Sequence, residues 1–248
     1  MKEIEISRII IEQYYNKLLD CLDSDVVIVG AGPAGLTAGC YLAENGVKTT
    51  ILEKRLSIGG GIWAGAAGYN VITVEDKSIL DQMGVSAQQT QDLYTVDAIE
   101  FATALAYKAK KAGVAIFNLM EAEDLIIKDG SVKGVVVNNT TLRSSGLLAD
   151  PFCIAGKYVI DTTGHPAELV NMIKAKQADF HPARLKEGFM DVDKAETGVV
   201  EKTGEVYPGL YVAGMSVCAV FGLPRMGPIF GGMLESGKKV AELIIQKI

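Results

Sequence analysis

The chain has 248 residues, of which 49% are hydrophobic and 22% charged, a composition typical of a globular α/β protein with a sizeable core. The formal net charge of −6 and the lack of a basic cluster argue against a nucleic-acid partner. No apolar stretch is long enough to cross a bilayer and the first residues are too charged for a signal peptide, so we expect a cytoplasmic protein without a membrane partner.

The first predicted element is an amphipathic helix over residues 3–20, where isoleucine, leucine and tyrosine recur at helical spacing between charged residues. Such a helix would cover the core or contact a neighbouring subunit. We expect a single domain over 1–248, in which 1–22 form this helix and 25–248 form a dinucleotide-binding fold with a β-hairpin insertion. The cysteines show no CxxC spacing, which favours reduced thiols over a disulfide framework.

The segment Asp25–Lys54 carries the strongest signal in the sequence. An apolar run is followed by Gly30, Gly32 and Gly35, then by a helical segment and a second apolar run that ends at Glu53. This order is the fingerprint of a dinucleotide site. The first glycine permits the tight turn, the second lets a pyrophosphate approach the backbone, and the third lets helix and strand pack closely. Because the helix N-terminus attracts phosphates and the Glu53 carboxylate can hold ribose hydroxyls, we expect an adenine dinucleotide here.

Glycine-rich and β-rich segments follow this motif. Residues 57–70 contain five glycines, which favour either a second anion-binding loop or a flexible surface loop. A helix is predicted over Val96–Ala112, and a hairpin is predicted around Asp129-Gly130, a strong turn dipeptide. Two later strands precede a C-terminal helix. The whole pattern predicts an α/β, doubly wound Rossmann-like fold with inserted β elements.

The end of one late strand bears on the identity of the dinucleotide. Flavoprotein reductases that share the first motif end in a strand written roughly GLYVAGD, whose Asp holds the ribityl chain of the flavin. This chain has Met215 at that place, and a thioether cannot accept a strong hydrogen bond from a sugar hydroxyl. The chain also lacks a second GxGxxG motif. A flavin site is therefore the less favoured interpretation.

Four stretches resemble a known family. GAGPAG, ILEKRLSIGGGIWAG, ADP followed by IDTTGH, and VAGMSVCAVFGLPRMGPIFGGML are similar to the motifs of the Thi4-type thiazole synthases, and the similarity covers nearly the whole chain. These enzymes make the thiazole half of thiamine as an adenylated intermediate. The resemblance implies that NAD is consumed as a substrate: its nicotinamide leaves, and the ADP-ribose portion condenses with glycine and a sulfur donor. It also implies Fe(II) as the metal.

The resemblance extends to the metal ligands. Asp150 and His165 match the iron-binding Asp and His of the family, which in relatives come together between neighbouring subunits of an octamer-like ring. A carboxylate and an imidazole suit a divalent metal. Without the resemblance, a lone Asp and a lone His would be interpreted as a cap and an ordinary polar residue. We therefore expect a homo-oligomer with shared metal sites, and we expect His181, which matches no ligand position, to be structural.

Arg225, in GLPRMGP, matches the residue that holds the glycine carboxylate in the family, and a planar guanidinium suits that task. On its own, such an arginine could equally pair with a structural carboxylate. The expected catalytic residues are thus Asp150, His165 and Arg225. The positions expected along the dinucleotide are Gly30, Gly32, Ala34, Gly35, Glu53, Lys54, Gly61, Leu125, Leu148, Ala149, Asp150 and Met215.

The sequence departs from the family at the sulfur-donating position. Eukaryotic members donate sulfur from a cysteine two residues before the Asp of the DP pair, whereas many archaeal members have His there and take free sulfide. Here the residue is Leu148, which has neither a sulfur nor a lone pair to offer. We expect the nearest thiol, Cys153, to lie in the core on the face opposite Asp150.

The resemblance and this departure together predict a sulfide-dependent enzyme with many turnovers. Two alternatives stay open: an FAD-dependent oxidoreductase, and a non-catalytic NAD-binding protein in which Leu148 marks lost chemistry.

Overall fold

Strand β1 (Asp23–Val29) lies in the middle of the main sheet of the computed structural model, which describes residues 1–177, 179–182 and 185–248. Its neighbours β2 (Thr49–Glu53) and β9 (Phe152–Asp161) both run parallel to it. The order across the sheet is β10-β11-β9-β1-β2-β6. The remaining strands of this order are β6 (Ala115–Asn118), β10 (Gly204–Tyr207) and β11 (Leu210–Val212). The predicted α/β, Rossmann-like fold is confirmed.

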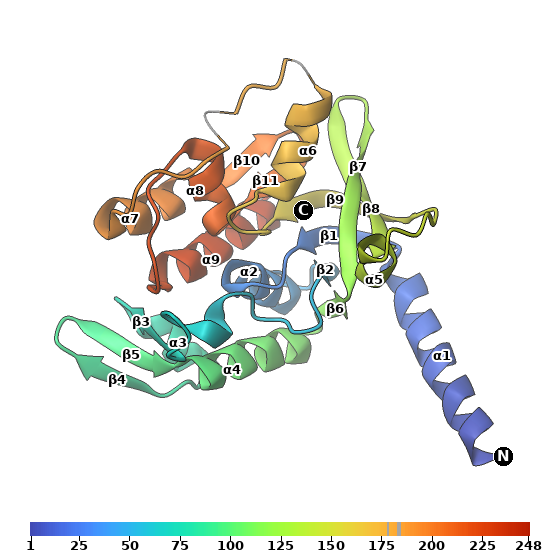
Figure 1. Cartoon of the computed structure of the whole chain (residues 1–248), viewed down its shortest axis with the longest axis horizontal. Coiled ribbons are helices and arrows are strands. Elements are labelled where there is room, and N and C mark those ends of the chain that lie inside the picture. The colour runs from blue at the N-terminus through green and yellow to red at the C-terminus, as the bar shows by residue number, and fades with distance from the viewer. Residues whose placement is uncertain (178, 183–184) are drawn as a thin grey trace.

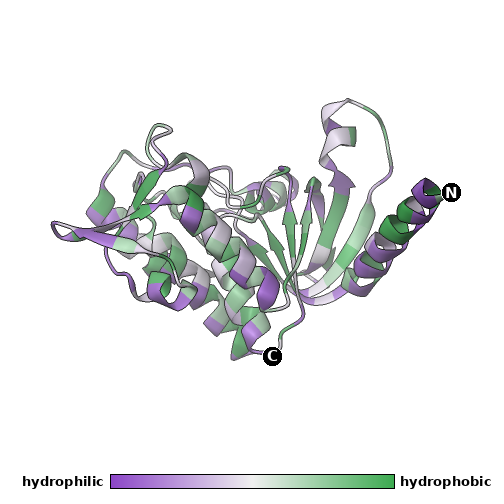
Figure 2. Cartoon of the chain, turned by 90° about the horizontal axis from the view of Figure 1, so that it is seen from below, coloured by the Kyte–Doolittle hydropathy of each residue, from purple (hydrophilic) through white to green (hydrophobic). Residues whose placement is uncertain are grey.

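The register of these parallel strands brings their carboxyl ends to one edge of the sheet. Val29 pairs with Leu52 on one side and with Asp161 on the other, so three strands end nearly level. Figure 2 shows that the strands of the main sheet are largely hydrophobic, which is expected for parallel strands covered on both faces. Ligands of such folds bind outside this edge.

Helices pack against strands of the main sheet and against one another. Helix α2 (Pro33–Glu44) follows β1 directly, and α9 (Gly231–Ile245) packs along it (Figure 1). The two helices approach so closely that a Cβ added at Gly237 would lie 2.4 Å from the carbonyl oxygen of Ala34. The other helices of the body are α4 (Ala98–Lys111), α6 (Glu168–Lys176), α7 (Val192–Lys202) and α8 (Met215–Phe221).

The predicted hairpin is confirmed as β7 (Met120–Lys128) and β8 (Ser131–Asn139). Asp129 and Gly130 form its turn with φ of 51° and 71°, the left-handed conformations that tight hairpins need. Strand β8 pairs antiparallel with β9, which attaches the hairpin to the main sheet, and the short helix α5 (Thr140–Ser144) follows it.

A second, three-stranded sheet was not predicted. It has the order β3-β5-β4, with β3 (Val71–Val74), β4 (Ala87–Thr90) and β5 (Leu93–Asp97), and is accompanied by η1 (Ile62–Ala64) and α3 (Ser78–Met83). The expected helix over Val96–Ala112 therefore begins too early. Its true start is Ala98, because the Asp97 carboxylate accepts hydrogen bonds from the N–H groups of Ile99 (2.8 Å) and Glu100 (2.9 Å) and caps the helix.

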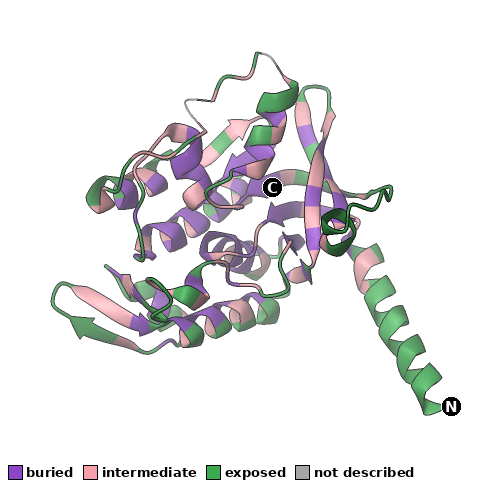
Figure 3. Cartoon of the chain, in the orientation of Figure 1, coloured by how far each residue is buried: buried purple, intermediate pink, exposed green. Residues whose placement is uncertain are grey.

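Helix α1 (Lys2–Cys21) matches the predicted N-terminal helix but extends away from the body, with its N-terminus far from the sheet (Figure 1). Figure 3 shows it exposed along almost its whole length. It is attached near its end, where the Tyr14 ring meets the edge of Phe117 and the Lys17 ammonium donates to the carbonyl of Ile116 at 2.5 Å. Across the described ranges, no helix has both the length and the apolar character needed to span a membrane.

Candidate active site

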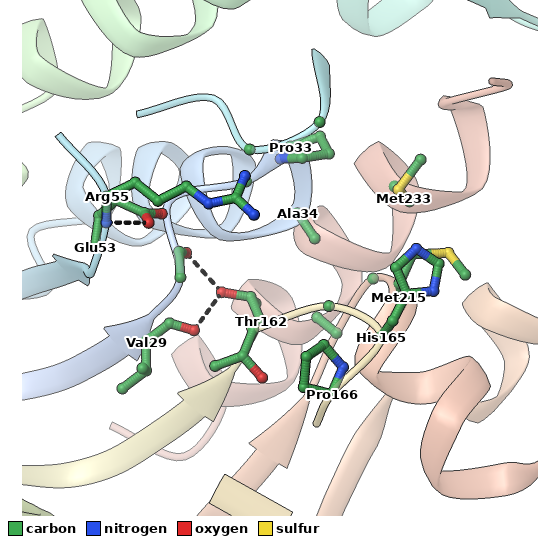
Figure 4. A pocket seen from close by; sticks show the side chains of 18 of the residues that line it. Val29, Pro33, Ala34, Glu53, Arg55, Thr162, His165, Pro166, Met215 and Met233 are labelled. Carbon is green, nitrogen blue, oxygen red and sulfur yellow. Dashed lines mark hydrogen bonds between the residues drawn. The ribbon is translucent and has the colours of Figure 1, made fainter. Parts of the chain in front are cut away.

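A cavity of about 590 Å³ opens at the carboxyl edge of the main sheet. The ends of β1, β2 and β9 form its floor, and the start of α2, the loop before η1, the start of β7 and the segment before α9 form its walls. Figure 4 shows Glu53 and Arg55 at one end of the cavity and His165, Met215 and Met233 at the other. Of the predicted site residues, those lining it are Gly30, Gly32, Ala34, Glu53, Lys54, Gly61, His165, Met215 and Arg225.

The first turn of the cavity uses its glycines as the motif predicts. Gly30 has φ of +106°, and Gly35 lies so close to the turn that an added Cβ would stand 2.1 Å from the carbonyl oxygen of Gly30. Gly35 therefore packs behind the turn rather than lining the cavity. Gly32 faces open space and precedes Pro33, and no side chain in the described part of the chain caps α2. The first N–H groups of this helix are thus free to bind an anion.

Glu53 links the two ends of this turn. One carboxylate oxygen accepts a hydrogen bond from the N–H of Ala31 and the other from the N–H of Arg55, both at 2.9 Å. The side chain is buried but lines the cavity, and each oxygen keeps a second lone pair that can accept a further hydrogen bond. These contacts hold the carboxylate where a sugar hydroxyl can donate to it.

Two cations lie beside Glu53. The Lys54 ammonium pairs with Glu168 at the start of α6, which connects the two sides of the cavity. The Arg55 side chain, which the sequence analysis did not single out, extends along the cavity in Figure 4 and has no ion-pair partner within the ranges that the structure describes. Arg55 therefore adds an unpaired positive charge to the end of the cavity that carries Glu53.

The glycine-rich segment 57–70 borders the cavity rather than standing free of it. The N–H of Gly59 donates to the carbonyl of Ala31 at 2.7 Å, and a Cβ at Gly60 would lie 3.0 Å from Cα of Gly32. Gly60, Gly61 and Gly65 all line the cavity. Of the two roles predicted for this segment, a ligand-facing loop agrees better with its position.

At the opposite end, Asp161 supports the turn that carries His165. Its fully buried carboxylate accepts hydrogen bonds from the N–H groups of Thr163 (2.9 Å) and Leu169 (3.0 Å) and from the hydroxyl of Ser216 (3.1 Å). Burial raises the pKa of this carboxyl above its ordinary value, and the hydrogen bonds oppose that rise. One side chain thus ties together β9, the turn, α6 and α8.

His165 and Arg225 are joined by a residue that the sequence analysis missed. Nδ1 of His165 lies 2.6 Å from one carboxylate oxygen of Glu187, and Nε of Arg225 lies 3.7 Å from the other. Glu187 is only 11% exposed, whereas His165 and Arg225 are 55% and 56% exposed. A single glutamate in an irregular segment gives no sequence signal of this kind. Arg225 therefore does pair with a carboxylate, as the alternative interpretation expects, but only through its Nε atom.

Besides Gly35, four predicted residues lie outside the cavity of the single chain. Leu125, which is expected along the dinucleotide, does not line the cavity. It is buried halfway along β7, opposite Val135, and the cavity wall is instead formed by residues 120–122 at the start of that strand. The other three, Leu148, Ala149 and Asp150, are exposed in the segment between α5 and β9.

The donor set of the expected metal fits only in part within one chain. His165 is exposed and its Nε2 has no hydrogen bond within the described chain, and the carboxylate of Asp150 is likewise exposed without a hydrogen bond there. Both suit a divalent cation. Yet Asp150 does not line the cavity that His165 lines, and within the described ranges no three His, Cys, Asp or Glu side chains gather as a metal site. The expectation that Asp150 comes from a second subunit stays a prediction.

The cysteines bear on the source of sulfur. The expectation that Cys153 lies in the core is wrong: it is exposed, because the alternation along β9 places Ile154 inside and Cys153 outside. Burial raises the pKa of the Cys40 thiol to about 11 and that of Cys218 to about 12. Neither of these buried thiols is a thiolate near neutral pH. His181 is exposed and lies outside the cavity.

The chain is similar to known proteins over its whole length. The model of the Thi4 family matches residues 7–230. The chain is 50% identical over 252 residues to a thiamine thiazole synthase of Thermococcus kodakarensis, covering 100% of this chain and 99% of the relative. It is 45% identical over 255 residues to one of Methanothermobacter thermautotrophicus, with the same coverage. A crystal structure of THI4 from Thermovibrio ammonificans superposes with a TM-score of 0.96 and 44% identity, covering 100% of this chain and 98% of that one. The chain belongs to the Thi4 family.

Proposed function

We propose that the chain is a thiamine thiazole synthase that makes an adenylated thiazole from NAD, glycine and sulfide, with Fe(II), over many turnovers. The observation that carries the proposal is the cavity of this Thi4-family chain. One end of the cavity has the Glu53 carboxylate, which suits ribose hydroxyls, and the other end has His165 and Arg225.

The order of groups along the cavity fits a dinucleotide. Glu53 accepts the hydroxyls of the adenosine ribose, and its negative charge disfavours a 2′-phosphate, so NAD is preferred to its phosphorylated form. The uncapped N-terminus of α2 beside Gly32 binds the pyrophosphate. The second ribose and the nicotinamide then reach the end that carries His165, where the leaving group departs and the new ring is built.

The reactive end supplies two further functions. Arg225 holds the glycine carboxylate between its terminal nitrogens, which have no partner elsewhere in the described chain. His165 and Asp150, the latter from a second copy of the chain, hold the divalent metal. When bound, the metal supplies open coordination positions for glycine-derived and sulfur-bearing groups. The partners of the chain are therefore small molecules and further copies of itself.

The thiols of the chain support sulfide as the sulfur source. Leu148 has no sulfur, Cys40 and Cys218 are buried with raised pKa values, and Cys153 lies on the outer side of β9. A chain that does not donate its own sulfur is not consumed by the reaction and can turn over repeatedly.

The test is a reaction with anaerobically purified protein, NAD, glycine, sulfide and Fe(II), followed by mass spectrometry. We expect several product molecules per subunit and no product when any one component is omitted. Product limited to one molecule per subunit, with the protein losing the mass of one sulfur, would overturn the catalytic form of the proposal.

The same experiment separates the two alternatives. A non-catalytic NAD-binding protein returns NAD intact and releases no nicotinamide. A flavin absorption spectrum of the purified protein supports the oxidoreductase, against which the position of Met215 in the cavity argues.

A further inference from the structure

Glu187 contacts both functional side chains at the reactive end of the cavity. We propose that Glu187 is a positioning residue that fixes the orientation of His165 and of Arg225 together, so that one carboxylate sets the geometry of both the metal ligand and the glycine-binding cation. The inference rests on the proposed function only for the identity of the two ligands.

The contacts divide the two oxygens of Glu187 between the two partners. One oxygen lies 2.6 Å from Nδ1 of His165, a short hydrogen bond, and the other lies 3.7 Å from Nε of Arg225, within ion-pair distance. The anchoring carboxylate is 11% exposed, while the groups that it contacts are more than half exposed. Exposed side chains keep their rotamer freedom unless something fixes them, and here the fixing group is the least exposed of the three.

The backbone holds Glu187 in this place. Directly after it, the N–H of Gly188 donates to the carbonyl of Leu223 at 2.8 Å, and the N–H of Arg225 donates to the carbonyl of Phe189 at 3.2 Å. These bonds run between the segment of Glu187 and the segment of Arg225, so the carboxylate and the guanidinium start from neighbouring, mutually bonded stretches of chain. A chance encounter of two flexible side chains does not need such support.

The chemistry of the contact specifies the tautomer of His165. An ionised carboxylate only accepts hydrogen bonds, so Nδ1 of the neutral imidazole carries the proton and Nε2 keeps its lone pair. Metal-binding histidines commonly donate their second N–H to a carboxylate in this way. On the other side, the engagement of Nε leaves both terminal nitrogens of Arg225 as a fork for a carboxylate.

Two substitutions separate these tasks. In Glu187→Ala, His165 loses its acceptor and Arg225 loses its anchor. We expect affinity for Co(II), used as the metal probe, to fall about 10- to 100-fold, and affinity for glycine, measured by calorimetry on protein saturated with ADP-ribose, to fall as well. In Glu187→Gln, the amide oxygen still accepts from Nδ1, so Co(II) affinity is largely kept. The amide NH₂ then faces the Nε donor of Arg225, and glycine affinity still falls. NAD affinity is unchanged in both.

The histidines offer a readout that does not depend on activity. The chain has only two, so histidine-selective ¹⁵N labelling gives two pairs of ring-nitrogen signals, and His181→Asn identifies the pair of His165. At a pH where both rings are neutral, His165 should carry its proton on Nδ1 in the wild-type protein and in Glu187→Gln, but shift toward Nε2 in Glu187→Ala. Glu201→Gln, an exposed change on α7, is the control and should leave the tautomer and both affinities unchanged.

The outcomes distinguish this inference from the proposed function. If Glu187→Ala keeps the wild-type tautomer and Co(II) affinity, Glu187 does not position His165. If thermal stability and NAD affinity fall together with Co(II) affinity in both variants, the role is structural and the inference is wrong. If the wild-type protein makes no thiazole, the proposed function fails, while the tautomer and Co(II) affinity still decide the role of Glu187.

Discussion

Gly30 lies so close to Thr162 that a Cβ added to the glycine would stand 2.4 Å from the Thr162 carbonyl oxygen. The Thr162 hydroxyl in turn lies 2.7 Å from the carbonyl oxygen of Gly30. The end of β1 and the end of β9 are therefore in direct backbone contact at the floor of the cavity, and only a hydrogen atom fits between them. The fold itself therefore requires glycine at position 30, whether or not a ligand is bound.

Gly30→Ala and Gly32→Ala should fail in different ways. At Gly30, with φ of +106°, alanine both strains the backbone and overlaps β9, so we expect a loss of more than about 2 kcal/mol in the free energy of unfolding. At Gly32, φ is −80° and a Cβ meets nothing within 4 Å, so we expect a cost below about 1 kcal/mol. The new methyl group of Gly32→Ala nevertheless stands where the pyrophosphate approaches, and NAD affinity should fall on the order of tenfold, about 1.4 kcal/mol.

Urea denaturation and calorimetric NAD titration of both variants check this contrast. A Gly32→Ala protein of normal stability that binds NAD as tightly as the wild type would show that the pyrophosphate does not lie against this turn.

Glu196 should make the protein less stable as pH rises through the weakly acidic range. One carboxylate oxygen accepts a 2.6 Å hydrogen bond from the N–H of Gly232, and the other is buried without a partner in the described parts of the chain. Burial and the charge of Glu75 raise the pKa of Glu196 from 4.5 to about 7. The folded state thus holds a proton that the unfolded state loses first, so the stability present below about pH 4.5 declines until about pH 7, by about 3 kcal/mol at most.

Glu196→Gln removes this titration, because an amide stays neutral. The variant should gain stability relative to the wild type between those two pH values and keep a constant advantage above them. Denaturation midpoints over the pH range test this, with Glu201→Gln on the exposed side of the same helix as the control. Parallel pH profiles for wild type and Glu196→Gln would mean that the pKa of Glu196 is the same in the folded and unfolded states.

Complementation between chains tests whether the metal site is shared. His165→Ala should lose more than about 100-fold in metal affinity, because removing a metal ligand costs more affinity than removing a residue that only hydrogen-bonds to a ligand. Thiazole formation should be lost as well, while NAD should still bind at Glu53 and the start of α2. Asp150→Ala should behave in the same way. When the two inactive variants are co-expressed, random mixing in an oligomer restores both ligands at roughly a quarter of the sites, and activity returns.

A mixture that stays inactive, although successive purification on two different affinity tags shows mixed oligomers, places both ligands on one chain and contradicts the shared site. His181→Ala serves as the matched control and should keep metal affinity and activity.

Leu148→Cys should give the chain a sulfur of its own. The residue is fully exposed, two positions before Asp150, so a thiol there is accessible near the proposed metal ligand. Without sulfide, the variant should form at most one thiazole per subunit and lose the mass of one sulfur, while the wild type forms none. Cys153→Ser should leave sulfide-dependent activity unchanged, because Cys153 points outward from β9. Loss of that activity in Cys153→Ser would contradict the exogenous source.

Elements defined by short spacing could be predicted from the sequence. Gly30, Gly35 and Glu53 lie within one strand–turn–helix–strand unit, and their geometry follows from that unit alone. The hairpin turn at Asp129-Gly130 is equally local. The short sheet β3-β5-β4 could not be predicted, because its strands are four or five residues long and β4 is polar and mostly exposed, without a clear alternation.

Sequence patterns do not predict contacts that depend on the path of the whole chain. Glu187 meets His165, 22 residues earlier, and Arg225 only because two loop segments run side by side. Alternation counted from Asp150 predicts the wrong side for Cys153, because β9 begins only at Phe152, after the aspartate. A pattern gives the period of a strand, but its phase comes from the tertiary structure.

The pairing of β1 with β9 has a consequence for how the protein is made. The Thr162 hydroxyl reaches the carbonyl of Val29 across 133 residues of chain, and Gly237, close to the C-terminus, packs against Ala34. The glycine-rich turn therefore leaves the ribosome long before the segments that support it. A nascent chain that ends before β9 and α9 has no cavity for NAD, and parallel pairing over such distances is slow. Under the proposed function, NAD therefore stabilises only a chain in which these last segments have docked.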